Sequence, residues 1–221
     1  MEIHKHTGFK LLSLDLRDTT LMGKAALLYN FVEPSDEQKR IYTTVIIGAN
    51  GTGKSNLFRI VIELLKELED LSKDKGRTYN VDGRFRMKFS IYGNIYEYSN
   101  IYIASLLKEI PNISENGNTA YLLKNGKVEL FANVILPKAI VANSIMLTDK
   151  YPFFRKENNE KGEKVDAFPR YKYLGIRNIA QNASTRAYVR KTVEFITQEY
   201  ESVAFREGLK RATTFLGLTP I

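Results

Sequence analysis

The sequence contains no cysteine and only two histidines, His4 and His6. Without thiols, the chain cannot form disulfides, iron–sulfur clusters, Cys-ligated zinc sites or a thiol nucleophile. A Ser-His-Asp triad or a centre with several His ligands would have to be built around the N-terminus, where both histidines lie. The sequence therefore argues against thiol and His-based catalysis.

A continuous apolar run of the ~18 residues needed to span a bilayer is also missing. The most apolar stretch, Ala132–Leu147, is interrupted by Pro137 and Lys138. The N-terminus lacks the basic stretch followed by an apolar one that is typical of a secretory signal peptide. We therefore expect a soluble, cytoplasmic protein that does not contact membranes.

Positive charge is in excess and unevenly distributed. The 221 residues carry a net charge of +8, and hydrophobic residues make up 43%, as in globular proteins. The segment Lys150–Lys191 contains eleven Lys and Arg but only four Asp and Glu, which gives it a net charge of +7. The rest of the chain carries a net charge of only +1. Such a segment is typical of phosphate or nucleic-acid binding, and we expect it to contact DNA. The alternative is a solvated loop whose acidic partners lie elsewhere.

Hydrophobic periodicity predicts the elements of the first third of the chain. Residues 9–18 alternate between apolar and polar and predict a strand, with which the apolar run 25–32 could pair. Tyr42–Ile47 is β-branched and nearly all apolar, which is typical of a buried, central parallel strand. Residues 54–72 have one apolar face and predict a helix, whose opposite face carries charged residues.

Two hairpins are predicted next. The first spans residues 84–99 with a turn at Gly93-Asn94, and the second spans residues 121–131 around Asn125-Gly126, the strongest two-residue turn signal. Residues 84–131 should therefore form an antiparallel layer.

The remaining third mixes short strands, a loop and helices. A buried strand is predicted over residues 138–143, a charged loop over 151–170 and a short strand over 171–175. Helices are predicted from Thr185 and from Phe205.

The segment Gly48–Ser55 matches the motif G-x-x-x-x-G-K-[ST] at every fixed position. The glycines allow backbone N–H groups to turn inward around a phosphate, and the N-terminus of the following helix adds a partial positive charge. Lys54 can reach the β- and γ-phosphate oxygens, and the Ser55 hydroxyl can hold Mg²⁺. The motif predicts binding of ATP with Mg²⁺; the alternative is a glycine-rich turn that caps a helix without a ligand.

The residues between the glycines make the match more specific. The segment resembles the P-loop of ABC-type head ATPases of the RecF, SMC, Rad50 and OLD branch. The resemblance implies that nine residues bind the nucleotide, with Ser55 also a metal ligand: Gly48, Ala49, Asn50, Gly51, Thr52, Gly53, Lys54, Ser55 and Asn56. Two further strings, Leu136–Ala142 and Tyr171–Arg177, resemble segments of bacterial AAA-family ATPases encoded beside restriction or anti-phage systems.

The resemblance carries expectations about fold, activity and partners. It implies an α/β P-loop NTPase fold: the N-terminal half of an ABC-type head, with a mixed sheet, an antiparallel β segment and a C-terminal helical segment. We expect a nucleotide-binding half-head over residues 1–148, and a basic loop with the start of a helical subdomain over 149–221. The implied function is ATP binding in DNA repair or anti-phage defence, in a homodimeric full-length protein with a partner effector or nuclease.

Two motifs of that family are missing. After the P-loop there is no apolar run ending in Asp-Glu, which would hold Mg²⁺ and polarise water, and there is no Ser-Gly-Gly-like signature. No catalytic residue can be assigned, and the stop at Ile221 suggests a truncated chain or a split gene product. We therefore expect ATP binding with hydrolysis near background.

Weaker candidates and other functions stay open. Asn143 or Gln181 could act as the Mg²⁺-sensing amide, and Tyr29 or Phe31 could stack on the base, although an ordinary loop amide and a core aromatic are the simpler interpretations. The alternative functions are a P-loop kinase, a GTPase and a non-catalytic nucleotide-binding interaction module.

Overall fold

The structure is a computed structural model. It describes residues 8–23, 25–32, 43–74, 82–104, 120–144, 150–154, 156–158, 162–175 and 185–215. Over these residues the protein is a mixed α/β structure with a mostly antiparallel sheet and three α-helices. The chain divides into two compact units, Met1–Ile140 with Lys150–Arg170, and Val141–Asp149 with Tyr171–Ile221.

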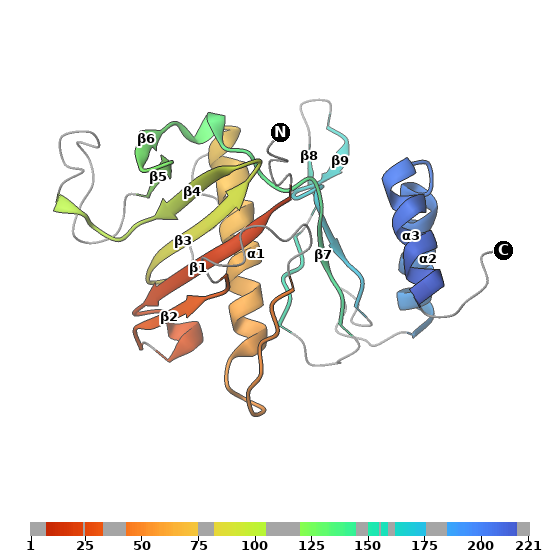
Figure 1. Ribbon diagram of the computed structural model, residues 1–221, viewed down its shortest axis with the longest axis horizontal. Helices are drawn as coiled ribbons and strands as arrows, with labels where there is room; N and C mark the ends of the chain where they lie inside the picture. Colours follow the sequence, from red (N-terminus) through yellow and green to blue (C-terminus); the bar gives the residue numbers. More distant parts are fainter. Residues whose placement is uncertain are drawn as a thin grey trace, which may run out of the picture. The chain divides into compact units, whose positions relative to one another are not determined.

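The first unit contains a six-stranded antiparallel sheet (Figure 1). In spatial order its strands are β2 (Leu27–Asn30), β1 (Lys10–Arg17), β3 (Arg84–Ile91), β4 (Asn94–Ser99), β5 (Tyr121–Lys124) and β6 (Lys127–Glu129). The predicted pairing of the first two strands and the predicted antiparallel layer are confirmed. The structure adds that both belong to one sheet, because β1 pairs with β3.

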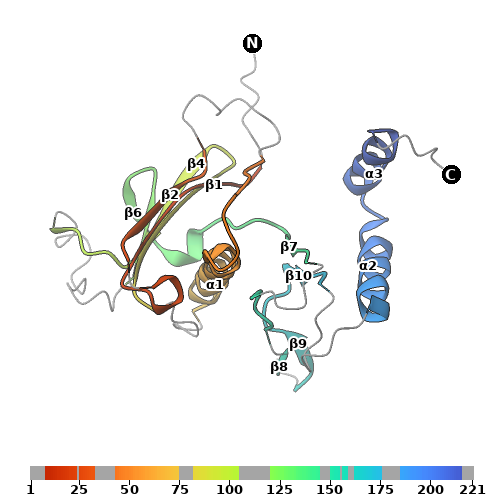
Figure 2. The same ribbon diagram turned by 90° about the horizontal axis from the view of Figure 1, so that it is seen from below.

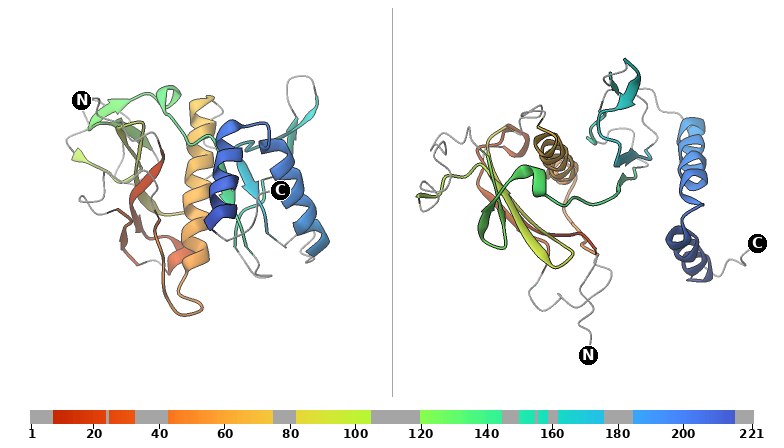
Figure 3. Two further views of the ribbon diagram at one scale, coloured as in Figure 1. Left: turned by 45° about the vertical axis from the view of Figure 1, so that its right-hand side comes forward. Right: turned by 90° about the horizontal axis from the view of Figure 1, so that it is seen from above.

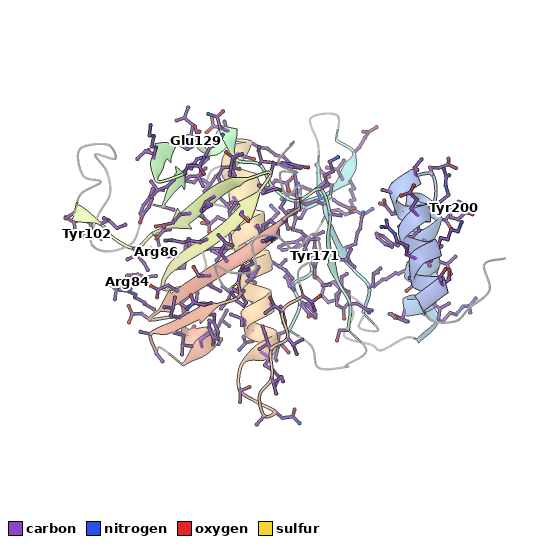
Figure 4. The ribbon with its side chains drawn as sticks, in the orientation of Figure 1. Arg84, Arg86, Tyr102, Glu129, Tyr171 and Tyr200 are labelled. Carbon is purple, nitrogen blue, oxygen red and sulfur yellow. The ribbon has the colours of Figure 1, made fainter. Side chains whose placement is uncertain are left out.

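Alternation along the strands gives the sheet one buried face. In β3, Phe85, Met87 and Phe89 are fully buried, while Arg84 and Arg86, labelled in Figure 4, lie on the other face. Figure 2 shows helix α1 (Lys54–Ser72) lying across one face of the sheet, and the buried side chains identify that face. A period of two places every second residue against the helix.

Tyrosines of β4 pack within this buried face. Tyr96 and Tyr98 are fully buried, and the rings of Tyr96 and Phe89 stack with centroids 5.2 Å apart. Tyr98 contacts Phe85, with ring centroids 4.9 Å apart. The two tyrosines therefore pack across the strand pair in the core.

The two hairpin turns use pairs of residues with positive φ. At the β5–β6 turn these are the predicted Asn125 and Gly126, with φ of 51° and 80°. At the β3–β4 turn they are Tyr92 and Gly93, with φ of 50° and 75°, so the prediction of Gly93-Asn94 is wrong by one residue. The strand register decides this, because it makes Asn94 the first residue of β4, paired with Ile91.

Helix α1 has the predicted bounds, but its charged side is also buried. Five charged residues in its second half are each at most 4% exposed: Glu63, Lys66, Glu67, Glu69 and Asp70. Lys66 pairs with Asp70 one turn away. Arg170, distant in the sequence, donates from Nε to Glu69 Oε2 at 2.5 Å. A segment of the same unit that is distant in the sequence therefore contacts the charged side of α1.

Short strands complete the two units. The predicted charged loop contains an antiparallel hairpin of β8 (Lys156–Asn158) and β9 (Lys164–Asp166). The predicted strands at 138–143 and 171–175 are present as β7 (Ile140–Ala142) and β10 (Tyr171–Tyr173), which are hydrogen-bonded to each other. The Ile140 N–H donates to the Arg170 carbonyl and the Leu174 N–H to the Ala142 carbonyl, both at 2.8 Å. This pattern is parallel, so the β structure is mixed.

The second unit ends in two helices, α2 (Thr185–Glu199) and α3 (Val203–Phe215), with a sharp break between them (Figure 3). The rings of Phe195 and Phe205 contact each other across the break, with centroids 6.3 Å apart. Both predicted helices are confirmed, the second beginning two residues earlier than predicted. No helix within the described ranges is both long enough and apolar enough to cross a membrane.

We expect Gly83→Ala to destabilise the protein by about 3 kcal/mol. Gly83 has φ +93°, and a Cβ there would lie 2.6 Å from the Arg17 carbonyl oxygen and 2.8 Å from the Thr19 nitrogen. Backbone atoms cannot move aside as a flexible side chain can. Urea unfolding measures the loss of stability.

Gly126→Ala is the matched control for Gly83→Ala. Gly126 has a similar φ of +80°, but a Cβ there would meet no atom within 4 Å. This variant should lose only about 1 kcal/mol, the cost of the left-handed conformation. Equal losses in the two variants would refute a steric role for the contact between Gly83 and the end of β1.

Candidate functional site

The predicted phosphate-binding loop leads directly into α1, where it is seen in orange in Figure 1. Gly51 and Gly53 have φ of +84° and +87°, a conformation that L side chains rarely adopt. The first helical bond joins the Leu57 N–H to the Gly53 carbonyl at 2.9 Å. Gly53 provides no side-chain cap, and no acid lies in the first turn. The helix therefore presents its partial positive charge without a neighbouring carboxylate.

The Lys54 ammonium is enclosed by the loop. Its Nζ donates to the Gly48 carbonyl at 2.6 Å and to the Ala49 carbonyl at 2.7 Å. Its next contact, Thr52 Oγ1, lies 3.5 Å away, at the limit for a hydrogen bond. An ammonium group has three protons to donate, so Lys54 can hold the loop and still offer a donor to a phosphate oxygen.

Thr52 closes the loop from the other side. Its hydroxyl donates to the Ala49 carbonyl at 2.9 Å, and its N–H donates to the same oxygen at 3.4 Å. A Cβ on Gly48 would lie 2.8 Å from Thr52 Oγ1, so the closed loop leaves no room for a side chain at position 48. Gly48 through Thr52 are exposed, which leaves their backbone open to a ligand.

The metal-binding prediction depends on Ser55, which is half-buried in the first turn of α1. In the described part of the chain, no group of three or more His, Cys, Asp or Glu side chains could hold a metal ion. A hydroxyl and phosphate oxygens fit Mg²⁺, which prefers oxygen ligands and retains several waters. The residues present therefore fit Mg²⁺ delivered with the nucleotide, held by Ser55 and the phosphates.

Asn56 has a contact that the sequence did not indicate. Its Nδ2 donates to the Leu21 carbonyl at 2.8 Å, across 35 positions of sequence. Leu21 belongs to η1 (Thr20–Met22), a 3₁₀ turn in the β1–β2 connection. The predicted contact of Asn56 with the nucleotide would compete for the same amide.

The strand predicted to enter the loop is not formed. Residues 43–47 belong to no strand, and Val45 and Ile47 are 74% and 91% exposed. The prediction of a buried central strand over Tyr42–Ile47 is therefore wrong for residues 43–47. Tyr42 lies outside the described ranges. The Thr44 hydroxyl donates to the Phe31 carbonyl at 3.2 Å. β-branched residues favour extended backbone, but burial requires neighbouring strands, which composition does not supply.

The weaker candidates are scattered. Tyr29 and Phe31 stack on each other with ring centroids 6.3 Å apart. Asn143 is exposed after β7 and belongs to the second unit. Gln181, His4 and His6 lie outside the described residues.

The basic segment from Lys150 to Lys191 is divided between the two units. Arg170 is engaged with Glu69 on α1. Lys191 lies over the Tyr173 ring at 5.4 Å, where burial and the nearby Arg190 lower its pKa. Lys156 and Lys164 on the β8–β9 hairpin are exposed. The segment is thus not one continuous described surface, and DNA contact stays a prediction.

Comparisons with protein-family models, with curated proteins and with solved structures found no match.

Proposed function

We propose that the protein binds Mg·ATP through Gly48–Ser55, as the ATP-binding N-terminal part of an ABC-type ATPase acting in DNA repair or anti-phage defence. One observation carries this proposal. The Lys54 ammonium is held by two loop carbonyls beside the uncapped N-terminus of α1, and Gly51 and Gly53 have the positive φ that such a loop requires. Helix dipole, backbone N–H groups and ammonium then converge on one exposed segment.

The position of α1 supports the choice of family. The helix lies against the antiparallel sheet (Figure 2), and Arg170 of the same unit reaches Glu69 on the helix. The resemblance implies an antiparallel β segment following a P-loop helix, and β3 to β6 provide it. The exposed apolar side chains of Val45 and Ile47 fit a proposal in which further strands pair with this segment in the complete head.

Each residue of the site has a distinct role in this proposal. Lys54 neutralises phosphate charge, and the backbone of Gly51 to Gly53 surrounds the phosphates. Ser55 provides a hydroxyl ligand to Mg²⁺, which when bound withdraws charge from the phosphate oxygens. Thr52 keeps the loop closed through the Ala49 carbonyl.

We expect Ser55→Ala to lose the Mg²⁺ dependence of ATP binding. In the wild type, removing Mg²⁺ with EDTA should weaken ATP binding about tenfold. The contacts that Mg²⁺ makes with Ser55 and the phosphate oxygens are then lost, and such a change corresponds to ~1.4 kcal/mol of binding free energy. Ser55→Ala should bind ATP with that weaker affinity whether or not Mg²⁺ is present. Calorimetric titration with ATP measures both constants.

Ser72→Ala provides the matched control for Ser55→Ala. Ser72 ends the same helix, where its hydroxyl donates to the Glu69 carbonyl at 2.7 Å, far along α1 from the loop. It should bind ATP as the wild type does, with and without EDTA. If Ser55→Ala keeps the full response to EDTA, Ser55 is not the metal ligand.

A further inference from the structure

The β1–β2 connection reaches the phosphate-binding loop. The Leu21 carbonyl accepts the hydrogen bond from Asn56 Nδ2 at 2.8 Å. The neighbouring Met22 places its thioether against Gly53, since a Cβ on this glycine would lie 3.0 Å from Met22 Cε and 3.2 Å from Sδ. One 3₁₀ turn thus touches the last glycine of the loop and the first turn of α1.

Residues at and just before the start of β3 hold the segment that contains this turn. Asp82 Oδ2 accepts hydrogen bonds from the Thr20 N–H at 3.1 Å and from the Thr20 hydroxyl at 2.5 Å. Arg84, at the start of β3, pairs with Asp18 at 2.5 Å. The turn is therefore held by Asp82, which precedes β3, and Asp18 just before the turn is held by Arg84, the first residue of β3.

Gly53 is the residue at which this contact matters most. Its φ of +87° sets the direction of the chain as it enters α1, and hence the direction of the first N–H groups of the helix. Met22 packs beside this glycine, and the amide of Asn56 ties the turn to the helix three residues later. A loop already held in its binding conformation loses less entropy when the ligand arrives.

We propose that Asn56 and Met22 act as positioning residues, which clamp the β1–β2 connection onto Gly53 and preset the loop for phosphate. Asn56 then acts through the Leu21 carbonyl and not by touching the nucleotide. This inference rests on the proposed function, because it assigns these residues a role in the same site. Loss of one such hydrogen bond, together with the loosened loop, should weaken ATP binding about tenfold.

Methionine methyl NMR tests the clamp directly, because the chain has only four methionines. Met22 reports on the clamp, and Met87, fully buried in β3, is an internal reference for the fold. In the wild type, Mg·ATP should shift the Met22 methyl resonance and leave that of Met87 in place. Asn56→Leu keeps the shape of the side chain but cannot donate. It should move the Met22 resonance before nucleotide is added, and weaken ATP binding about tenfold by calorimetry.

Two further variants complete the test. Asn133→Leu removes another side-chain amide, which donates to Glu129 Oε1 at 2.7 Å, and it should change neither the Met22 resonance nor ATP affinity. Met22→Ala keeps the Asn56 hydrogen bond and removes the thioether. Met22→Ala should weaken ATP binding as Asn56→Leu does. If the Met87 resonance shows that Asn56→Leu does not fold, Met22→Ala tests the clamp in its place.

The outcomes separate the alternatives. If Asn56→Leu weakens ATP binding but leaves the nucleotide-free Met22 resonance unchanged, Asn56 contacts the nucleotide itself and the inference is overturned. If Met22→Ala binds ATP as the wild type does, the clamp has no positioning role. If the wild type shows no binding heat with Mg·ATP, the proposed function fails, whereas the nucleotide-free comparison of wild type and Asn56→Leu still tests the clamp.

Discussion

Lys54→Ala is expected to weaken Mg·ATP binding about 1,000-fold, which leaves no binding detectable at ordinary concentrations. The charge-assisted hydrogen bond to a phosphate oxygen, worth about 3 kcal/mol, and the attraction of the ammonium for the remaining phosphate charge, worth about 1 kcal/mol, account for this loss. The fold should survive, because among the described residues Lys54 Nζ bonds loop oxygens, those of Gly48, Ala49 and Thr52. Calorimetry or a fluorescent ATP analogue measures the affinity, and urea unfolding should agree with the wild type within ~0.5 kcal/mol.

The control for Lys54→Ala must remove the same charge elsewhere in the same unit. Lys127 is exposed on β6 and belongs to that unit. Lys127→Ala should bind Mg·ATP with wild-type affinity. If Lys54→Ala also binds with wild-type affinity, Lys54 does not contact phosphate and the proposed site is wrong.

Lys66→Met should have the largest effect on stability, a loss of about 4 kcal/mol. Lys66 and Asp70 form an ion pair whose two side chains are each only 2% exposed. Methionine fills much of the same space, but it removes the ammonium that neutralises a deeply buried carboxylate. Such a carboxylate has already lost its hydration, and without the ammonium this loss is offset less. Urea unfolding at neutral pH measures the change in free energy of unfolding.

Two comparisons isolate the buried pair. The double variant Lys66→Met/Asp70→Leu removes both charges and should recover most of the lost stability, since well-packed apolar residues often replace a buried pair at no net cost. Lys73→Met breaks another pair with the same spacing on the same helix, with Glu69, but Lys73 is 47% exposed. That variant should lose at most ~1 kcal/mol. A loss of that size in Lys66→Met would show that the Asp70 carboxylate does not depend on the Lys66 ammonium.

Local patterns predicted several elements to the residue. The bounds of α1 follow from its apolar spacing and from the glycine that precedes it, and neither depends on distant residues. Asn125-Gly126 fixed the β5–β6 turn, because few other pairs adopt two positive φ values at low cost. The β3–β4 turn has no such pair at its predicted position, and strand register moved it to Tyr92-Gly93.

Other features depend on partners far away in the sequence. The run 43–47 has the composition of a buried strand but is exposed, because no described strand pairs with it. Glu69 lies on the polar side of α1, yet it is buried and paired with Arg170, which is 101 positions away in the sequence. Neither segment by itself indicates which distant residues will contact it.

The candidate site divides in the same way. The sequence by itself determined the loop Gly48–Ser55, because glycines that adopt positive φ, a lysine and a hydroxyl at fixed spacing need only their neighbours to form it. Only the tertiary structure decided that Met22 lies against Gly53 and that Asn56 bonds Leu21, since these residues are more than 30 positions apart and meet only in the folded chain. Backbone conformation and hydrophobic periodicity depend on residues that are adjacent in the sequence. Burial and long-range contacts arise only when separate elements pack together.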